Sequence, residues 1–314
     1  MGTLGHEHTT MSEVETGLRE ELARADRVLS GIVPVLSHML TAPGVQLVSE
    51  ETCARIRGML EDLTSQLLGA AGLSKSDEAA RGHIDALRQH LSSESAILSH
   101  LYALAMEWHL SEQLETVGGI DPVLSPLLQE LIAADHPELA ELAMKTMVAQ
   151  SRFVQTQRRM QLVLSELPAE LFSLVVRQTV AFIREVPGEL SPVGIQALKH
   201  TYDEGDTRLG LLARLVKAMN QGAIAALDLE HSGFAFFASA LGILTEQPRE
   251  LAILSCSDNQ GARLALGLRA AGIDAQLLER QFAILGILHR PPSDIQNLSI
   301  ANAAAILRDS GKSR

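Results

Sequence analysis

Aromatic and basic residues are both scarce in this sequence. Phe, Trp and Tyr make up 3% of the 314 residues, and 38 Asp and Glu against 26 Lys and Arg give a formal net charge of −12. Nucleic-acid binding depends on cations that neutralise phosphates, and single strands also need aromatic side chains on which their bases stack. We therefore expect no nucleic-acid partner.

Cysteines and long apolar runs are also rare. The two cysteines, Cys53 and Cys256, lie far apart in the sequence, which does not indicate a disulfide framework. The most apolar stretch, LFSLVVRQTVAFI, is interrupted by Arg177 and Gln178, and the N-terminal residues lack the apolar core of a signal peptide. The sequence therefore predicts a cytoplasmic protein without a membrane span.

Sequence signatures of catalysis are missing as well. There is no Gly-x-Ser-x-Gly, no Gly-rich phosphate loop, and neither Glu-x-x-His nor His-Glu-x-x-His to hold a metal. Cys256 precedes a helix start beside Arg263, where the helix dipole could favour a thiolate or an anion. A buried small residue followed by a helix cap explains the same pattern. We expect no catalytic residue, no cofactor and no metal, so binding is favoured over chemistry.

What the sequence does contain is the periodicity of helices. Hydrophobic residues make up 46% of the chain and charged residues 20%, an ordinary globular composition. Apolar residues recur at spacings of three and four in most segments, and almost none alternates with the period of a strand. The predicted fold class is all-α, arranged as an irregular multi-helix array or as two packed helical bundles.

A break in the helical pattern suggests a division of the chain. Gly118 and Gly119 precede Asp121-Pro122, which has the form of a new helix start. Residues 1–134 carry 8 Lys and Arg against 19 Asp and Glu, whereas residues 135–314 carry 18 against 19. The sequence therefore predicts four parts, listed here: a flexible tail 1–11, an acidic helical domain 12–119, a second helical domain 120–310 and a tail 311–314.

Two segments carry a resemblance to a known family. They are AMKTMVAQSRFVQTQRRMQLVLSELPAELF at 143–172 and GFAFFASALGILTEQPRELAILSCSDNQGARLALGLRAAGI at 233–273. In apolar patterning, in the Ser-Glu-Leu-Pro joint and in the Ala-Phe-Phe helix, they resemble an uncharacterised alphaproteobacterial family of helical proteins labelled a domain of unknown function. The likeness covers roughly the C-terminal half to two thirds of the chain. It implies a cytoplasmic, all-helical fold and supplies no activity and no catalytic residue.

The segment from His136 to about Ser165 predicts a long helix with a heptad register. The two seam lines would be Leu142, Ala149, Thr156 and Val163, and Thr146, Phe153, Met160 and Leu167. In this register Lys145, Arg152 and Arg159 all occupy the g position, which faces charged positions of a partner helix. The three cations are therefore candidates to bind an acidic helix of a protein partner or of a second copy. Alternatively, the seam packs inside the fold and the cations pair with the acidic first half of the chain.

Function remains divided among three hypotheses. The leading one is a cytoplasmic helical module for protein–protein interaction or regulation. A helical small-ligand binder, or an enzyme without a recognisable motif, is the second. The third is a histidine phosphotransfer protein, for which His83 and His100 are the helical candidates, because the chemistry needs an exposed nucleophilic imidazole.

Overall fold

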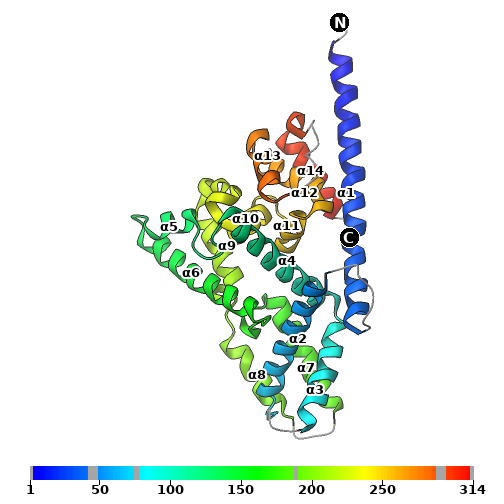
Figure 1. The fold of residues 1–314 in the computed structure, drawn as a ribbon, viewed down its shortest axis with the longest axis vertical. Helices are drawn as coiled ribbons and strands as arrows, with labels where there is room; N and C mark the ends of the chain where they lie inside the picture. Colours follow the sequence, from blue (N-terminus) through cyan, green and yellow to red (C-terminus); the bar gives the residue numbers. More distant parts are fainter. Residues whose placement is uncertain (1–2, 42–48, 74–77, 187–189, 288–294, 312–314) are drawn as a thin grey trace. The chain divides into compact units, whose positions relative to one another are not determined.

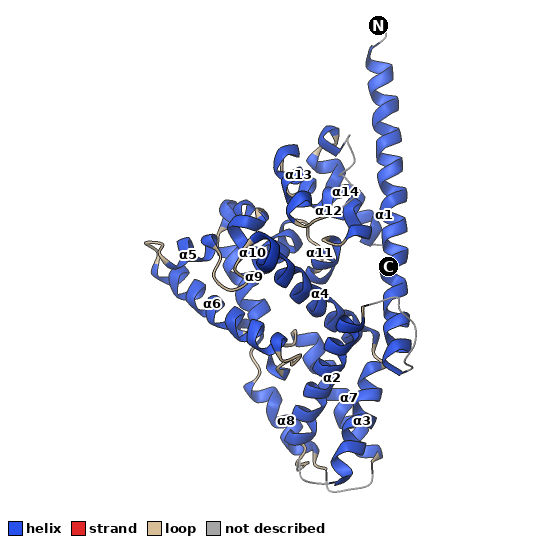
Figure 2. Cartoon of the chain, in the orientation of Figure 1, coloured by secondary structure: helices blue, strands red, loops and turns tan. Residues whose placement is uncertain are grey.

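The structure is a computed structural model that describes residues 3–41, 49–73, 78–186, 190–287 and 295–311. Within these ranges it contains helices and loops and no strand (Figure 2). The all-α prediction is therefore confirmed. No helix in the described ranges is both long and apolar enough to cross a bilayer.

The helices follow one another along the chain with short joints (Figure 1). The α-helices are α1 (Thr3–Thr41), α2 (Glu50–Ala70), α3 (Glu78–Ser92), α4 (Ser95–Gly118), α5 (Pro126–Ile132), α6 (Pro137–Arg158), α7 (Ala169–Glu185), α8 (Pro192–Thr201), α9 (Arg208–Ala218), α10 (Leu229–Leu244), α11 (Arg249–Ser255), α12 (Gly261–Ala270), α13 (Ala275–Ile284) and α14 (Ile300–Gly311). The 3-10 helices are η1 (Leu164–Glu166), η2 (Glu204–Asp206), η3 (Asn220–Leu227), η4 (Asp258–Gln260) and η5 (Ile295–Asn297).

The chain divides into two compact units. Unit 1 comprises Met1–Ile32, His109–Met144 and Leu215–Arg314, and unit 2 comprises Val33–Trp108 and Lys145–Arg214. The divisions fall inside α1, α4, α6 and α9 and not in loops. They do not coincide with the predicted boundary at 119, so the predicted domains 12–119 and 120–310 stay predictions. The same holds for the two tails, although α1 already begins at Thr3.

Unit 1 has α10 as its most buried helix. Every residue from Phe234 to Gly242 is buried, as expected for a helix that carries Phe234, Phe236 and Phe237 on more than one face. Gly233, at φ 72° and ψ 165°, interrupts the helical backbone directly before this buried part. α12 packs on α14 in the same unit.

Unit 2 contains a bundle of α2, α3, α7 and α8, whose neighbouring members pack on one another. α2 begins directly after Ser49, whose side-chain oxygen caps the helix by accepting a hydrogen bond from the Thr52 N–H at 3.2 Å. Leu60 and Leu63 of α2 and Leu87 of α3 are almost completely buried. Gly194 of α8 lies so close to α2 that an added Cβ would stand 1.9 Å from the Ala70 carbonyl oxygen.

Two helices end at a glycine that stands in the same local sequence pattern, Ala-Ala-Gly followed by an apolar residue. Gly72 has φ 96° after α2, and Gly272 has φ 91° after α12. In each case the following apolar residue donates its N–H to a carbonyl five residues earlier, at 2.9 Å for Leu73 and 3.0 Å for Ile273. This is the Schellman pattern, in which a left-handed glycine satisfies the last helical carbonyls.

Periodicity and cap residues in the sequence predict helices over 207–229, 274–289 and 293–309, the last one capped by Ser293, and these bounds are wrong. The segment 207–229 is not one helix, because Asn220, at φ 50°, separates α9 from η3. The helix predicted over 274–289 ends at Ile284, and the one predicted over 293–309 begins at Ile300. Ser293, the predicted cap of that last helix, lies outside the described residues.

Candidate binding pocket at the end of α6

α6 ends at Arg158, before the predicted end near Ser165. Met160 has a left-handed φ of 55°, and the N–H groups of Met160 and Gln161 donate to the carbonyls of Gln157 and Thr156 at 3.0 and 2.9 Å. This is again a Schellman ending, with a methionine at the position that glycine usually occupies. The predicted continuation of the heptad seam through Met160, Val163 and Leu167 is therefore wrong, because these residues lie beyond the helix.

Polar side chains of α2 hold the segment that follows α6. The Leu162 N–H donates to Asp62 Oδ2 at 3.1 Å, and the Leu164 N–H donates to Gln66 Oε1 at 2.9 Å. Gln66 Nε2 donates in return to the Leu162 carbonyl at 2.9 Å. These bonds replace those that a longer α6 would have made within itself, which explains how the chain can leave the helix without orphaned backbone groups.

The backbone of the turn also lies directly against α2. A Cβ on Gly58 would stand 2.7 Å from the Met160 carbonyl oxygen and 2.8 Å from the Met160 Cβ, so only glycine allows this approach. Arg55, one turn earlier on the same face of α2, donates from Nη1 to the Gln157 carbonyl. Gly58 and Arg55 thus fix where α6 stops.

Two short 3-10 turns exchange carboxylates to cap each other's following helix. Glu166 in η1 accepts a hydrogen bond from the Arg208 N–H at the start of α9, at 2.7 Å. Glu204 in η2 accepts one from the Ala169 N–H at the start of α7, at 3.0 Å. A carboxylate at a helix N-terminus satisfies a free N–H and faces the positive end of the helix dipole. The exchange holds the 164–166 segment beside the start of α9.

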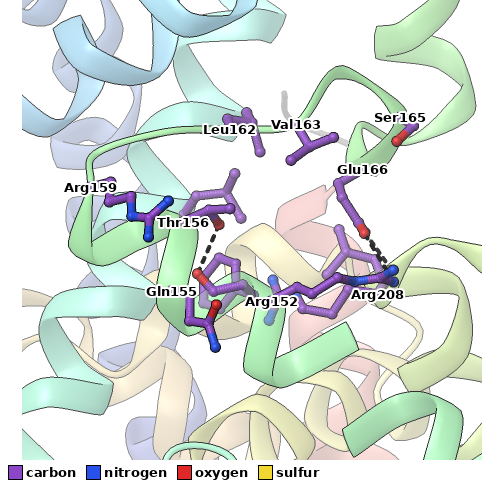
Figure 3. A pocket seen from close by; sticks show the side chains of 12 residues that line it. Arg152, Gln155, Thr156, Arg159, Leu162, Val163, Ser165, Glu166 and Arg208 are labelled. Atoms are coloured by element: carbon purple, nitrogen blue, oxygen red, sulfur yellow. Dashed lines mark hydrogen bonds and ion pairs between the residues drawn. The ribbon is translucent and has the colours of Figure 1, made fainter. Parts of the chain in front are cut away.

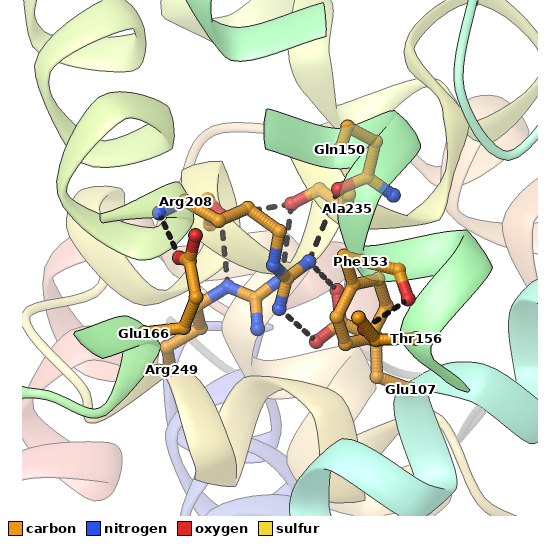
Figure 4. Close-up of polar contacts among 9 residues, drawn as sticks. Glu107, Gln150, Phe153, Thr156, Glu166, Arg208, Ala235 and Arg249 are labelled. Atoms are coloured by element: carbon orange, nitrogen blue, oxygen red, sulfur yellow. Dashed lines mark hydrogen bonds and ion pairs between the residues drawn. The ribbon is translucent and has the colours of Figure 1, made fainter. Parts of the chain in front are cut away.

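A buried ion pair lies next to this exchange. Arg208 Nη1 and Nη2 donate to Glu107 Oε1 and Oε2 at 2.7 and 2.9 Å, and Nη1 also lies 3.1 Å from Gln150 Oε1 (Figure 4). The guanidinium carbon stands 3.6 Å from the centroid of the Phe153 ring. The side chains of Arg208 and Glu107 are 4% and 0% exposed. Such a paired, stacked guanidinium is fixed in orientation on all sides.

A pocket of about 220 Å³ opens between the end of α6 and the segment after it (Figure 3). Its lining residues are Leu104, Arg152, Phe153, Gln155, Thr156, Arg159, Leu162, Val163, Ser165, Glu166, Arg208 and Leu209. Apolar atoms form most of the wall, and hydroxyl, amide, guanidinium and carboxylate groups also lie on it. A partly apolar pocket with a few convergent polar groups is the usual form of a binding site.

Two of the three predicted partner-binding cations line this pocket. Arg152 and Arg159 are exposed and belong to the lining, and Arg152 Nη2 lies 3.6 Å from Glu166 Oε1. Lys145 is also exposed, on the same helix, but does not line the pocket. The Arg159 guanidinium makes no hydrogen bond or ion pair within the part of the chain that the structure describes, although its backbone N–H donates to the Thr156 carbonyl at 3.0 Å. The structure thus brings Arg152 and Arg159 to one site and leaves Lys145 beside it.

The charges around the pocket nearly cancel. Arg208 is neutralised by Glu107 behind the wall, and Arg152 is opposed by Glu166 at the rim. Arg159 is left as the cation without an opposing carboxylate among the described residues. The site therefore carries one net positive charge, which can attract one negative charge.

The histidine candidates lie elsewhere in unit 2. His100 is buried, at 3% exposure, so it is not the exposed imidazole that phosphoryl capture requires. His83 is partly exposed, and its Nδ1 is buried without a hydrogen-bond partner among the described residues. No cluster of three metal-binding side chains is found in the described ranges.

Both cysteines are buried and free. Burial raises the pKa of Cys256 to about 12, against which a hydrogen bond with Ser255 acts only weakly. Burial also raises the pKa of Cys53, although Arg57 opposes the shift. Neither thiol is therefore an activated nucleophile, because the thiolate is the reactive form.

The sequence did not single out Glu107, Glu166 or Arg208. Glu107 and Glu166 stand among mostly apolar residues and Arg208 follows the acidic segment 203–206, so nothing local marks any of the three as a partner in a long-range pair. The sequence did contain a signal for the contact between α2 and the segment after α6. One face of α2 carries polar residues and an internal glycine at spacings of three and four, which suggests the close approach of another backbone: Arg55, Gly58, Asp62 and Gln66.

Comparison with known proteins adds no relative to this description. No family model, no curated protein and no solved structure matches the chain. The resemblance to a helical family of unknown function stays a prediction, and the function is argued from the site alone.

Proposed function

We propose that the chain is a cytoplasmic interaction module that binds an acidic helical segment of a protein partner along the exposed face of α6. The observation that carries the proposal is a stripe of Lys145, Val148, Arg152 and Arg159, which we call the α6 stripe. All four are exposed, Val148 at 51%. Lys145, Val148 and Arg152 are i,i+3 and i,i+4 neighbours on one face of α6, and Arg159 follows directly after Arg158, the last residue of the helix.

Charge and apolar surface together support an acidic amphipathic partner. The chain has a net charge of −12, so a stripe with three cations and an exposed valine stands out from the whole. In helix pairs, flanking charges select the partner and apolar residues between them supply the contact. An anionic neighbour, Glu166 beside Arg152, limits the attraction and favours a partner that also offers an apolar face.

The test reverses two of the charges. Partners recovered with the wild-type chain from native cells are identified and purified. Their association rates are then measured with the wild-type chain and with the double variant Arg152→Glu/Arg159→Glu. We expect association to slow about tenfold or more at low salt and the difference to shrink as salt screens the charges. The matched control is Arg158→Glu, an exposed cation at the same helix end that does not line the pocket.

Thermal melts of the same variants separate binding from folding. Exposed ion pairs contribute only about 0–1 kcal/mol, so losing the contact between Arg152 and Glu166 leaves the melt nearly unchanged. A large loss of stability with intact partner binding per folded molecule would assign the cations a structural role and refute the proposal. Equal effects of Arg158→Glu and of the double variant would refute it as well.

A further inference from the structure

We propose that the pocket at the end of α6 binds a small monocarboxylate with an apolar body. This goes beyond a protein partner on the α6 stripe, because the ligand is a small molecule and the site is the pocket beside the stripe. Arg152 and Arg159 belong both to the α6 stripe and to the pocket lining (Figure 3). Lys145 and Val148 belong to the stripe alone, and the other lining residues belong to the pocket alone.

The size of the pocket restricts the ligand. Its volume of about 220 Å³ lies below the range of about 300–1,000 Å³ that is typical of sites for drug-sized ligands. The pocket can therefore surround only part of a nucleotide or of a larger cofactor. The space suits a molecule of on the order of ten non-hydrogen atoms.

The walls define its apolar part. Leu104, Phe153 and Leu162 are buried residues that present side chains to the pocket, and Val163 and Leu209 complete the apolar lining. Water held against such a wall makes few hydrogen bonds, and an alkyl or phenyl group releases it. A purely polar acid would leave this surface unused.

The charges define its head group. Arg208 is already bound by Glu107 and Gln150, and Arg152 faces Glu166. Arg159 supplies the net positive charge, and a planar carboxylate matches the fork of a guanidinium. A phosphate dianion would bring a second negative charge close to Glu166 without a cation to compensate it. A monoanion is therefore favoured over a dianion.

Calorimetry on the full chain tests the proposal with hexanoate, hexanol, hexylammonium and inorganic phosphate as probes. We expect hexanoate to bind at least tenfold more tightly than each of the other three. Equal binding of hexanol or of phosphate would overturn the proposal, and so would the absence of hexanoate binding at millimolar concentration. The carboxylate could also be a peptide C-terminus, so acetyl-Gly-Leu and its amide form a second pair, and tighter binding of acetyl-Gly-Leu than of hexanoate assigns that source.

Variants locate the binding in the pocket. Arg159→Gln removes the head-group cation at an exposed position and should weaken hexanoate about tenfold, whereas Arg158→Gln beside it should not. Val163→Trp fills the space from a side chain that is 40% exposed and should abolish binding without loss of helix content. Unchanged hexanoate affinity in both Arg159→Gln and Val163→Trp would overturn the assignment.

The same variants keep this proposal separate from partner binding. Lys145→Glu lies on the α6 stripe and outside the pocket, so it should slow partner association and leave hexanoate affinity unchanged. Val163→Trp should abolish hexanoate binding and leave partner association unchanged. If hexanoate binds and Lys145→Glu has no effect on partners, the interaction proposal fails alone; if partners depend on Lys145 and hexanoate does not bind, the pocket proposal fails alone.

Discussion

At the scale of single residues, the buried pair of Glu107 and Arg208 is the feature with the clearest energetic consequence. Both side chains are almost fully buried, and two hydrogen bonds at 2.7 and 2.9 Å join them. Removing one partner leaves the other charge buried without compensation, which typically costs about 3–5 kcal/mol. Replacing both by apolar residues of similar volume is often close to neutral.

We therefore expect Glu107→Leu to lower the free energy of unfolding by about 3–5 kcal/mol, and Glu107→Leu/Arg208→Met to lower it much less. Urea unfolding of the wild type, both single variants and the double variant gives the coupling energy. A loss below about 1 kcal/mol in Glu107→Leu would show that the pair does not organise the pocket wall.

Cys256 allows a prediction about pH. Its folded pKa is about 12, against about 9 for a free thiol, because burial disfavours the thiolate. Between about pH 9 and pH 12 the unfolded chain releases this proton and the folded chain keeps it. The unfolded state then binds fewer protons, so stability falls as pH rises, by about 1.4 kcal/mol per pH unit from this residue.

Denaturation of Cys256→Ala across this range is the corresponding measurement. The variant should lose stability with pH less steeply than the wild type, whatever its stability at neutral pH. Native-state labelling with a thiol reagent at pH 8 should also be slow for Cys53 and Cys256 and fast in denaturant. Rapid native labelling of Cys256, or parallel pH profiles, would contradict its burial.

At the scale of elements, the turn between α6 and η1 depends on Gly58. Gly58→Ala places a Cβ within 2.8 Å of two Met160 atoms, so the turn or α2 must shift. We expect a loss of about 1–3 kcal/mol, the usual range for overpacking. Gly69, in the same helix and with open space around its added Cβ, is the matched control.

Gly69→Ala should leave stability equal or raise it by up to about 1 kcal/mol, because alanine favours the helix over glycine. Thermal unfolding of the two variants side by side measures the contrast. If both substitutions behave alike, the close approach of α2 to the α6 turn does not decide where α6 ends.

This turn also shows what the sequence could and could not predict. The caps at Ser49 and the glycine stops at Gly72 and Gly272 were predictable, because each is written within a few neighbouring residues. The end of α6 was not, because Met160 takes a glycine-like conformation only where α2 supplies Asp62 and Gln66 as hydrogen-bond partners. Long-range contacts of this kind override local propensity.

At the scale of the whole molecule, the fold class followed from periodicity, whereas the site required the structure. Lys145, Arg152 and Arg159 are all exposed, but Arg159 lies just beyond the end of α6, and the role of the three cations in partner binding stays a prediction. The pocket behind two of them depends on Glu166 and Arg208, which lie in later elements. Sequence spacing within one helix cannot show which residues of other helices complete a site.

The central claim, that the α6 stripe binds an acidic segment, is tested most directly by photocrosslinking. A photoreactive benzoylphenylalanine replaces Val148 on the stripe or, as control, Val193 of α8, which is 72% exposed in the same unit. The account predicts that position 148 alone captures a partner peptide rich in Asp and Glu, and that the yield falls at 1 M salt, where the Debye length is about 3 Å. Equal capture at positions 148 and 193, or no partner peptide at 148, would contradict it.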